Sequence, residues 1–256
     1  MIPGNARERA LLALGAHLAV RRGLSAVALV VTGLSGVVVA VLAVARGGAR
    51  APWIPGLASS AIAWGGGLML AFGASLRAIP RDREEGIREL ARARGAELAA
   101  YVRGRAFGLV GVLAAAVSSA TFLACAAALA ATGERAAVAR STAGALAYAL
   151  AFAATMGPVT MAALGARTRV VGYLTLAVIL TLPEVLAPWS ARLLPKGWHE
   201  LTSIPAALAA IRAGVAHPIL AGPHAARAAA ALTAVVMLAL LAVAARARDS
   251  GRHDQD

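Results

Sequence analysis

One dense cluster of charged residues stands between two long apolar stretches, at positions 80–95. Its sequence is PRDREEGIRELARARG, in a chain in which 60% of the residues are hydrophobic and only 14% are charged. Asp82, Glu84 and Glu85 lie in its first half and Arg92 and Arg94 near its end, as the dipole of a helix favours. Such a segment can form ion pairs and dock on a second protein. It is therefore the first candidate for a functional site.

This cluster predicts one short amphipathic helix, Arg81–Arg94. Pro80 suits the first turn, where a missing N–H costs nothing, and Gly95 suits a left-handed end. Gly86 would stand inside the helix at a cost of about 1 kcal/mol relative to alanine, and could allow another backbone to approach closely. The candidate docking residues are Arg81, Asp82, Arg83, Glu84, Glu85, Gly86, Ile87, Arg88, Leu90 and Arg94.

Two spacings within the predicted helix suggest how it would work. Glu84 and Arg88 stand four residues apart in the order that favours an ion pair. Ile87 and Leu90 share a face and would be the apolar anchors in a groove on a partner, while the charged residues set the register. The alternative is a solvated loop helix whose arginines only retain this side of the protein in the cytoplasm.

Other chemistry needs residues that the chain lacks or isolates. A phosphate-binding loop requires a lysine in Gly-x-x-x-x-Gly-Lys, and the only lysine is Lys196, in a different context. We therefore expect no nucleotide site, no catalytic residue, and no cofactor or metal in this chain. Glu184 lies in an apolar stretch, where an unpaired charge costs about 3 kcal/mol, so it is a candidate for a transport path. The alternative is that Glu184 only reaches the membrane interface.

Two weaker patterns admit an enzymatic interpretation. The sequence Gly33–Gly36 (GLSG) resembles the Gly-x-Ser-Gly motif of rhomboid intramembrane proteases, with Ser35 as the nucleophile. A small serine in a Gly-rich packing face is the alternative, because no histidine falls within the predicted spans. The histidines outside them could gather around a metal or simply be solvated; they include His199, His217 and His224.

The apolar stretches beside the cluster belong to a pattern that covers the whole chain. A bilayer core about 30 Å thick is crossed by a helix of about 20 apolar residues, and runs of that length recur here. A soluble domain of 256 residues could not bury so much apolar surface. We predict an all-α integral membrane protein, one transmembrane domain over residues 1–256, with six spans. The predicted spans are 24–44, 56–76, 107–131, 143–166, 170–189 and 228–245.

The basic residues are distributed unequally between the two sides of these spans. With the N-terminus in the cytoplasm, 17 of the 25 fall in cytoplasmic segments and 8 in outer segments. This bias follows the positive-inside rule and predicts both termini on the cytoplasmic side of a bacterial inner membrane. The net charge of +13 then reflects topology. Because no stripe of aromatic residues interleaves with the arginines, we expect no nucleic-acid partner.

Two further helices are expected outside the spans. Segment 6–20 places Leu11, Leu14 and Leu18 on one face, which suits a helix on the inner membrane surface, or an ordinary flanking helix. Segment 204–215 is apolar at helical spacing and carries one charge, Arg212. It suits a short helix that is re-entrant or rests on the outer leaflet.

The charged cluster and the segment after it resemble the motif of ABC-2-type transporter permeases. The matching stretches are 82–90 (DREEGIREL) and 99–105 (AAYVRGR). Gly86 stands at the family's glycine and Leu90 at its aliphatic position. Arg105 stands at the basic position that opens the third span, where the family usually has lysine. The six-span plan and the two additional helices also match, so the resemblance covers most of the chain.

This resemblance implies the membrane-spanning permease subunit of an ATP-binding cassette exporter. Two permease copies, or this chain and a sister chain, would pair with two cytoplasmic ATPase subunits that bind ATP and Mg. The charged helix would sit in a cleft on an ATPase, whose closure would rock the spans between inward-open and outward-open states. Gly95 departs from the family pattern, which often has proline there.

A narrower resemblance concerns Trp64, the glycine motif at 82–90 and the stretch from Arg169 to Pro183. These residues are similar to a membrane-spanning component of the haem exporter used in cytochrome c maturation. An ATP-independent transporter or channel, which would need no ATPase partner, is the alternative to both resemblances.

Overall fold

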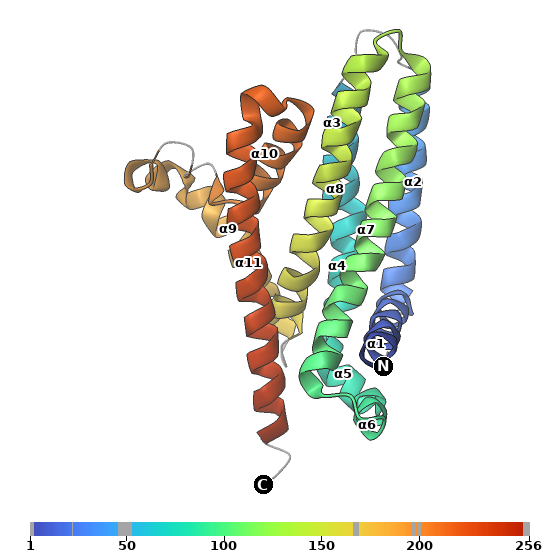
Figure 1. The fold of residues 1–256 in the computed structure, drawn as a ribbon, viewed down its shortest axis with the longest axis vertical. Coiled ribbons are helices and arrows are strands. Elements are labelled where there is room, and N and C mark those ends of the chain that lie inside the picture. The colour runs from blue at the N-terminus through green and yellow to red at the C-terminus, as the bar shows by residue number, and fades with distance from the viewer. Residues whose placement is uncertain are drawn as a thin grey trace.

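The computed structural model describes residues 3–21, 23–45, 53–165, 169–195, 198 and 201–252, which form a bundle of helices (Figure 1). This confirms the predicted all-α class. The helices are α1 (Pro3–Val20), α2 (Gly23–Ala45), α3 (Ile54–Ile62), the π-helix η2 (Ala63–Gly67), α4 (Leu68–Ser75), α5 (Ala78–Glu84), α6 (Ile87–Ala93), α7 (Leu98–Ala131), α8 (Arg135–Leu164), α9 (Arg169–Leu193), α10 (Ile204–Ala216) and α11 (Pro218–Arg252).

Six segments within the described residues are long and apolar enough to cross a membrane. They are Gly23–Ala45, Ile54–Ser75, Leu98–Ala131, Arg135–Leu164, Val170–Ser190 and Pro218–Ala245. The chain therefore has the make-up of a multi-pass membrane protein. The third, fourth and sixth helices begin eight to ten residues before the predicted spans. Hydropathy detects only the apolar run, whereas a helix continues through the arginine and alanine residues before it, which are good helix formers.

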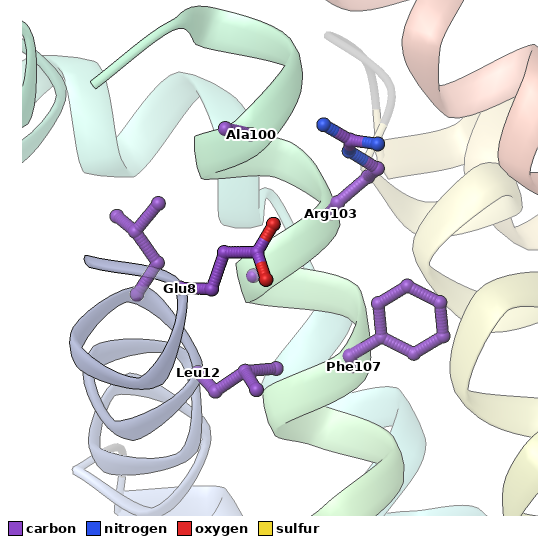
Figure 2. Close-up of a pocket in the computed structure, with 7 residues that line it drawn as sticks. Glu8, Leu12, Ala100, Arg103 and Phe107 are labelled. Carbon is purple, nitrogen blue, oxygen red and sulfur yellow. The ribbon is translucent and has the colours of Figure 1, made fainter. Parts of the chain in front are cut away.

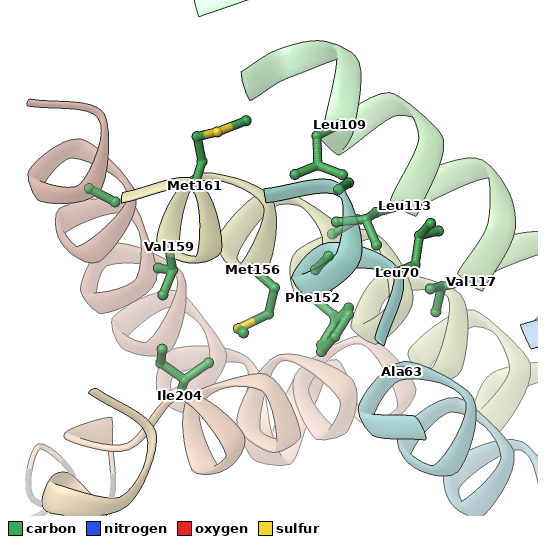
Figure 3. Close-up of a cluster of buried hydrophobic side chains, with 14 of the residues drawn as sticks. Ala63, Leu70, Leu109, Leu113, Val117, Phe152, Met156, Val159, Met161 and Ile204 are labelled. Atoms are coloured by element: carbon green, nitrogen blue, oxygen red, sulfur yellow. The ribbon is translucent and has the colours of Figure 1, made fainter. Parts of the chain in front are cut away.

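Helix α8 lies at the centre of the bundle. In its most apolar part 72% of the residues are buried, against 11% in α9 and 17% in α11. Figure 3 shows Phe152 and Met156 of α8 packed towards Leu70 of α4 and towards Leu109 and Leu113 of α7. The outer helices instead expose large apolar side chains, which suits contact with lipid tails or with another membrane subunit.

The second span contains a π-helical turn, η2, between α3 and α4. Trp64 in this turn donates a hydrogen bond from Nε1 to Oη of Tyr148 at 2.7 Å, and its ring meets Phe152 edge to face. A side chain at Gly66 would collide with Thr32 of α2. The wide turn thus directs Trp64 at α8, while the glycine lets α2 approach closely.

Helix α1 packs along the beginning of α7. A methyl group at Gly108 of α7 would lie 2.8 Å from the Cα of Gly15, and one at Gly104 would lie 2.8 Å from the Cβ of Leu11. Small residues on both helices allow this close contact. Leu11 and Leu18 are buried. The apolar face that we expected on the membrane surface is therefore directed at α7.

A groove of about 190 Å³ runs beside this contact between α1 and α7 (Figure 2). Its lining residues are Glu8, Leu11, Leu12, Ala100, Arg103, Gly104 and Phe107. No described polar atom in this lining is buried without a hydrogen-bond partner. The groove is the margin of a packing contact and shows no feature that would select a ligand.

Helix α10 matches the short apolar helix expected between the fifth and sixth spans. Ser203 caps it, with Oγ accepting a hydrogen bond from the N–H of Ala206 at 3.1 Å. Gly214 of α10 faces Ala225 of α11, so closely that a side chain there would collide. Figure 1 shows α10 beside α8 and α11, at the end of the bundle opposite both termini. We call that end the far end.

Candidate functional site at the charged end of the bundle

The charged cluster lies at the end of the bundle where both termini also lie (Figure 1), here called the charged end. The prediction of a single helix from Arg81 to Arg94 is wrong, because α5 and α6 are separate. Gly86 lies between them with φ of +67°, in the left-handed region. This conformation breaks the helix, and glycine adopts it without steric cost. Gly95, with φ of +75°, ends α6 as predicted.

Gly86 is expected to be required for its backbone conformation, and not for close approach within this chain. Nothing lies within 4 Å of a Cβ built at Gly86. We predict that Gly86→Ala lowers the free energy of unfolding by about 1–2 kcal/mol, and Gly86→Asn by less, since asparagine tolerates this region better. Thermal unfolding in detergent measures the difference. Gly111→Ala, also in open space but with an ordinary helical backbone, is the control, and equal losses at both sites would contradict the prediction.

The exposed charges of α5 form ion pairs around the junction. Nη2 of Arg77 lies 2.8 Å from Oε1 of Glu84, and Nε of Arg81 lies 2.7 Å from Oε1 of Glu85. Glu84 thus pairs with Arg77 and not, as predicted, with Arg88. The break at Gly86 separates Glu84 from Arg88. All four paired side chains are more than a third exposed, so each pair contributes less than about 1 kcal/mol.

One carboxylate of the cluster is buried. Asp82 is only 2% exposed, and its Oδ2 accepts hydrogen bonds from Nε of Arg105 at 2.9 Å and from Oη of Tyr101 at 2.7 Å. Arg105 is equally buried and donates from Nη1 to the carbonyl oxygen of Gly15 at 3.3 Å. Asp82, Tyr101 and Arg105, which we call the Asp82 cluster, connect α5 with α7 and α1. The prediction that Asp82 belongs to the docking surface is therefore wrong.

A second connection joins the α4–α5 elbow to the end of α8. Arg77 has φ of +51°, which is rare for a residue with a side chain, and its N–H donates to the carbonyl oxygen of Leu164 at 3.1 Å. One turn earlier in α8, the hydroxyl of Thr160 lies 3.0 Å from the hydroxyl of Ser75 in α4. The start of α5 is thereby held on the central helix of the bundle.

A polar cavity of about 170 Å³ lies beside the Asp82 cluster. Its lining residues are Leu18, Arg21, Gly23, Arg81, Asp82, Glu85 and Arg105. Nη2 of Arg105 is buried and has no hydrogen-bond partner among the described residues. The cavity has room for water, which could form hydrogen bonds with the polar side chains that line it. Arg21, at the end of α1, lies 3.9 Å from Glu85, so α1 reaches the charged end a second time.

Helix α6 exposes one large apolar side chain. Leu90 is 58% exposed, whereas Ile87 is half-buried against the core and Ala91 is buried. Of the two residues expected as anchors, only Leu90 is exposed enough to contact a partner, and its role as an anchor stays a prediction. Arg88 is half-buried. The other predicted docking residues are exposed: Arg81, Arg83, Glu84, Glu85, Gly86 and Arg94.

The sequence contains a pattern that indicates the Asp82 cluster, and the prediction of a docking helix did not use it. Tyr101 and Arg105 stand four residues apart, and this spacing places them on one face of α7. A phenol and a guanidinium on one face form a donor pair suited to a carboxylate. The missing information was which of the nearby carboxylates faces them, and that depends on the elbow between α4 and α5.

The remaining candidate residues lie apart from this site. Glu184 is exposed on α9 and does not line the cavities described here, so its role in transport stays a prediction. The Oγ of Ser35 donates to the carbonyl oxygen of Val31 in its own helix at 2.8 Å. In the described part of the chain, no group of three potential ligands could hold a metal. Lys196 and His199 lie outside the described residues.

The comparisons with known proteins found no relative of this chain. No family model, no curated protein and no solved structure matches it.

Proposed function

We propose that this protein is the membrane-spanning permease subunit of an ATP-binding cassette exporter, and that α5 and α6 contact its ATPase. Six apolar helices provide the spans. The chain has no lysine in a phosphate-binding loop, so ATP and Mg would be bound by a separate subunit. The resemblance of residues 82–105 to the ABC-2-type motif supports the same assignment.

The buried Asp82–Arg105 ion pair is the observation that carries this proposal. An exposed charged helix on a flexible loop could bind a partner but could not move the spans. Here the short segment is tied to α7 and α1 through the Asp82 cluster, and to α8 through the backbone of Arg77. Displacement of α5 would therefore be passed to three helices of the bundle.

The two parts of the segment suit different roles in this mechanism. Helix α6 presents Leu90 and arginines to the partner, whereas α5 carries the buried carboxylate. Gly86 between them can absorb a change of direction because glycine has a wide range of backbone conformations. Closure of an ATPase would move α6, and α5 would convey the movement to the spans.

The position of the protein in the cell follows from the same proposal. The arginine bias would place the charged end and both termini in the cytoplasm of a bacterial cell, with the spans in the inner membrane. Helices α2, α9 and α11 are mostly exposed in the single chain. They offer surface for lipid and for a second permease copy or a sister subunit.

Co-purification tests the contact with the ATPase. The full chain is co-expressed with a candidate ATP-binding cassette ATPase, and the ATPase retained on the tagged permease is quantified. We expect Leu90→Asp to reduce this amount about 10-fold, because it places a charge at an apolar contact that the ATPase would bury. Leu193→Asp is the matched control, since Leu193 is 85% exposed on α9, at a distance from the cluster along the chain.

The result of this experiment and two further assays, of transport without an ATPase and of proteolysis, separate the alternatives. Equal retention of the ATPase by both variants would refute a docking role for α6. Transport by the permease alone, without any ATPase, would indicate the ATP-independent transporter or channel. A proteolytic activity lost in Ser35→Ala would indicate the rhomboid-type protease.

A further inference from the structure

A second site lies at the far end of the bundle, between α3, α8 and α10. It is a cavity of about 370 Å³. Its lining residues are Trp53, Gly56, Leu57, Ser60, Ser141, Arg212, Ala213, Ala216 and His217. None of them belongs to the charged end, so the ATPase contact proposed above does not account for this cavity.

Arg212 is the charged group of this cavity, and neutral groups hold it in place. Nη1 donates to the carbonyl oxygen of Gly56 at 2.6 Å and to Oγ of Ser60 at 3.0 Å. The guanidinium carbon lies 5.4 Å from the centre of the Tyr148 ring. Trp64 fixes that ring through the hydrogen bond to its hydroxyl. The arginine is thus oriented before any ligand arrives.

No carboxylate among the described residues forms an ion pair with Arg212. A guanidinium has five N–H donors, and the hydrogen bonds to Gly56 and Ser60 both start from Nη1. Neither hydrogen bond uses the donors on Nε and Nη2, and Arg212 lines the cavity. Arginine in a partly apolar setting binds carboxylate or phosphate oxygens in preference to other groups, because its planar donors match their geometry.

The rim of the cavity adds an apolar requirement. Trp53 is 74% exposed and Leu57 is 68% exposed, and both stand at the start of the second span. Exposed apolar side chains of this size suit an acyl chain, and an aromatic residue at a span end suits the membrane interface. The hydroxyl of Ser141 offers a further donor across the cavity.

We propose that this far-end cavity binds the phosphate headgroup of an anionic amphiphile. Arg212 would donate to the phosphate oxygens, and Trp53 and Leu57 would contact the start of the acyl chain. The inference does not depend on the ATPase contact, because it uses a different end of the bundle and different residues. A permease with this site would be able to hold a phosphorylated lipid at the far end.

Ligand retention by the full chain tests this site. Purified protein in dodecyl maltoside is incubated with lysophosphatidic acid, with monoacylglycerol of the same chain length, or with inorganic phosphate. Native mass spectrometry then measures the ligand bound. We expect lysophosphatidic acid to be retained in preference to both other probes. Arg212→Gln should weaken its binding about 10- to 100-fold, as the loss of charge-assisted hydrogen bonds implies.

Two further variants keep the result interpretable. Arg227→Gln removes an exposed arginine of α11 outside the cavity and should leave binding unchanged. Ser141→Asp adds a carboxylate to the lining of the same cavity without changing Arg212, Gly56 or Ser60, and should weaken binding as much as Arg212→Gln. This variant tests the site even if Arg212→Gln does not fold.

Three outcomes would overturn the proposal. Equal retention of monoacylglycerol would show that the cavity selects only the acyl chain. Equal retention of inorganic phosphate, or its displacement of lysophosphatidic acid at comparable concentration, would assign the site to a soluble anion instead of a lipid. Unchanged binding in both Arg212→Gln and Ser141→Asp would exclude the cavity altogether.

Discussion

Replacing Asp82 by alanine is expected to lower the free energy of unfolding by about 3–5 kcal/mol, the usual cost of leaving one member of a buried ion pair without its partner. Arg105 would remain 2% exposed, and Tyr101 would also lose its acceptor. Denaturant unfolding of the full chain in detergent measures this loss. In the exporter proposed above, the same variant should uncouple ATP hydrolysis from transport, because α5 would be detached from α7 and α1.

Glu84→Ala is the matched control for this prediction. Glu84 lies two residues away on the same helix, and its ion pair with Arg77 is exposed. Its loss should cost less than about 1 kcal/mol. Similar losses for Asp82→Ala and Glu84→Ala would contradict the structural role of the Asp82 cluster.

The double variant Asp82→Leu with Arg105→Met separates the ion pair from the shape of the site. Replacement of both charges by apolar groups removes the unpaired charge, so much of the stability lost in Asp82→Ala should return. Coupling is expected to stay impaired if the directional hydrogen bonds transmit the movement. Full recovery of coupled transport would show that packing alone is sufficient.

Gly108→Leu is expected to have the second large effect, a loss of about 3 kcal/mol or more. The backbone of α1 occupies the space where a side chain at Gly108 would lie, with the N atom of Ala16 and the Cα of Gly15 both too close. Because these are backbone atoms, no rotamer change can relieve the collision. Helix α1 should separate from α7, and Arg105 would then lose its hydrogen bond to the carbonyl oxygen of Gly15.

Gly111→Leu tests whether this effect depends on the α1–α7 contact. Gly111 lies less than one turn further along α7, and nothing lies within 4 Å of a Cβ built there. This variant should be neutral, or slightly stabilising since leucine favours the helix. Limited proteolysis of the N-terminal segment should increase only for Gly108→Leu. Equal protection of α1 in both variants would contradict the proposed packing.

Both predictions concern the attachment of the charged end to the bundle, and they would affect function in different ways. Asp82→Ala disconnects α5 from the spans, whereas Gly108→Leu displaces the helix that braces the cluster from the other side. Leu90→Asp, in contrast, should weaken the contact with the ATPase and leave stability unchanged. The three variants together distinguish binding of the ATPase from transmission of its movement.

Most of the membrane architecture could be predicted from the sequence. The apolar runs have the length that a bilayer requires, so the number of spans and the positions of their apolar parts followed from hydropathy alone. The short helix α10 was predicted for the same reason, from the spacing of its apolar residues. Helix ends were less predictable, because a helix continues through polar residues such as those at the start of α7.

The charged segment shows where prediction from the sequence reached its limit. Its residue types predicted helical structure correctly, and the predicted contact with a partner stays a prediction. Nothing local, however, distinguishes Asp82, which is buried, from Glu84, which is exposed. That difference depends on the left-handed elbow at Arg77, which turns one face of α5 towards Tyr101 and Arg105. The sequence likewise did not decide whether the helix breaks at Gly86, since glycine is compatible with both a helix interior and a left-handed turn.

The sequence by itself determined the class of the protein. The length of the apolar runs must match the thickness of the bilayer, and this length can be read from the sequence without knowledge of the packing. Only the tertiary structure decided which polar groups are paired and which are available. Arg105 and Arg212 are both arginines beside apolar segments, but Arg105 has a buried carboxylate and Arg212 has only neutral partners among the described residues. Long-range packing brings such groups together, so the difference between a structural ion pair and a candidate anion site appears only in the folded protein.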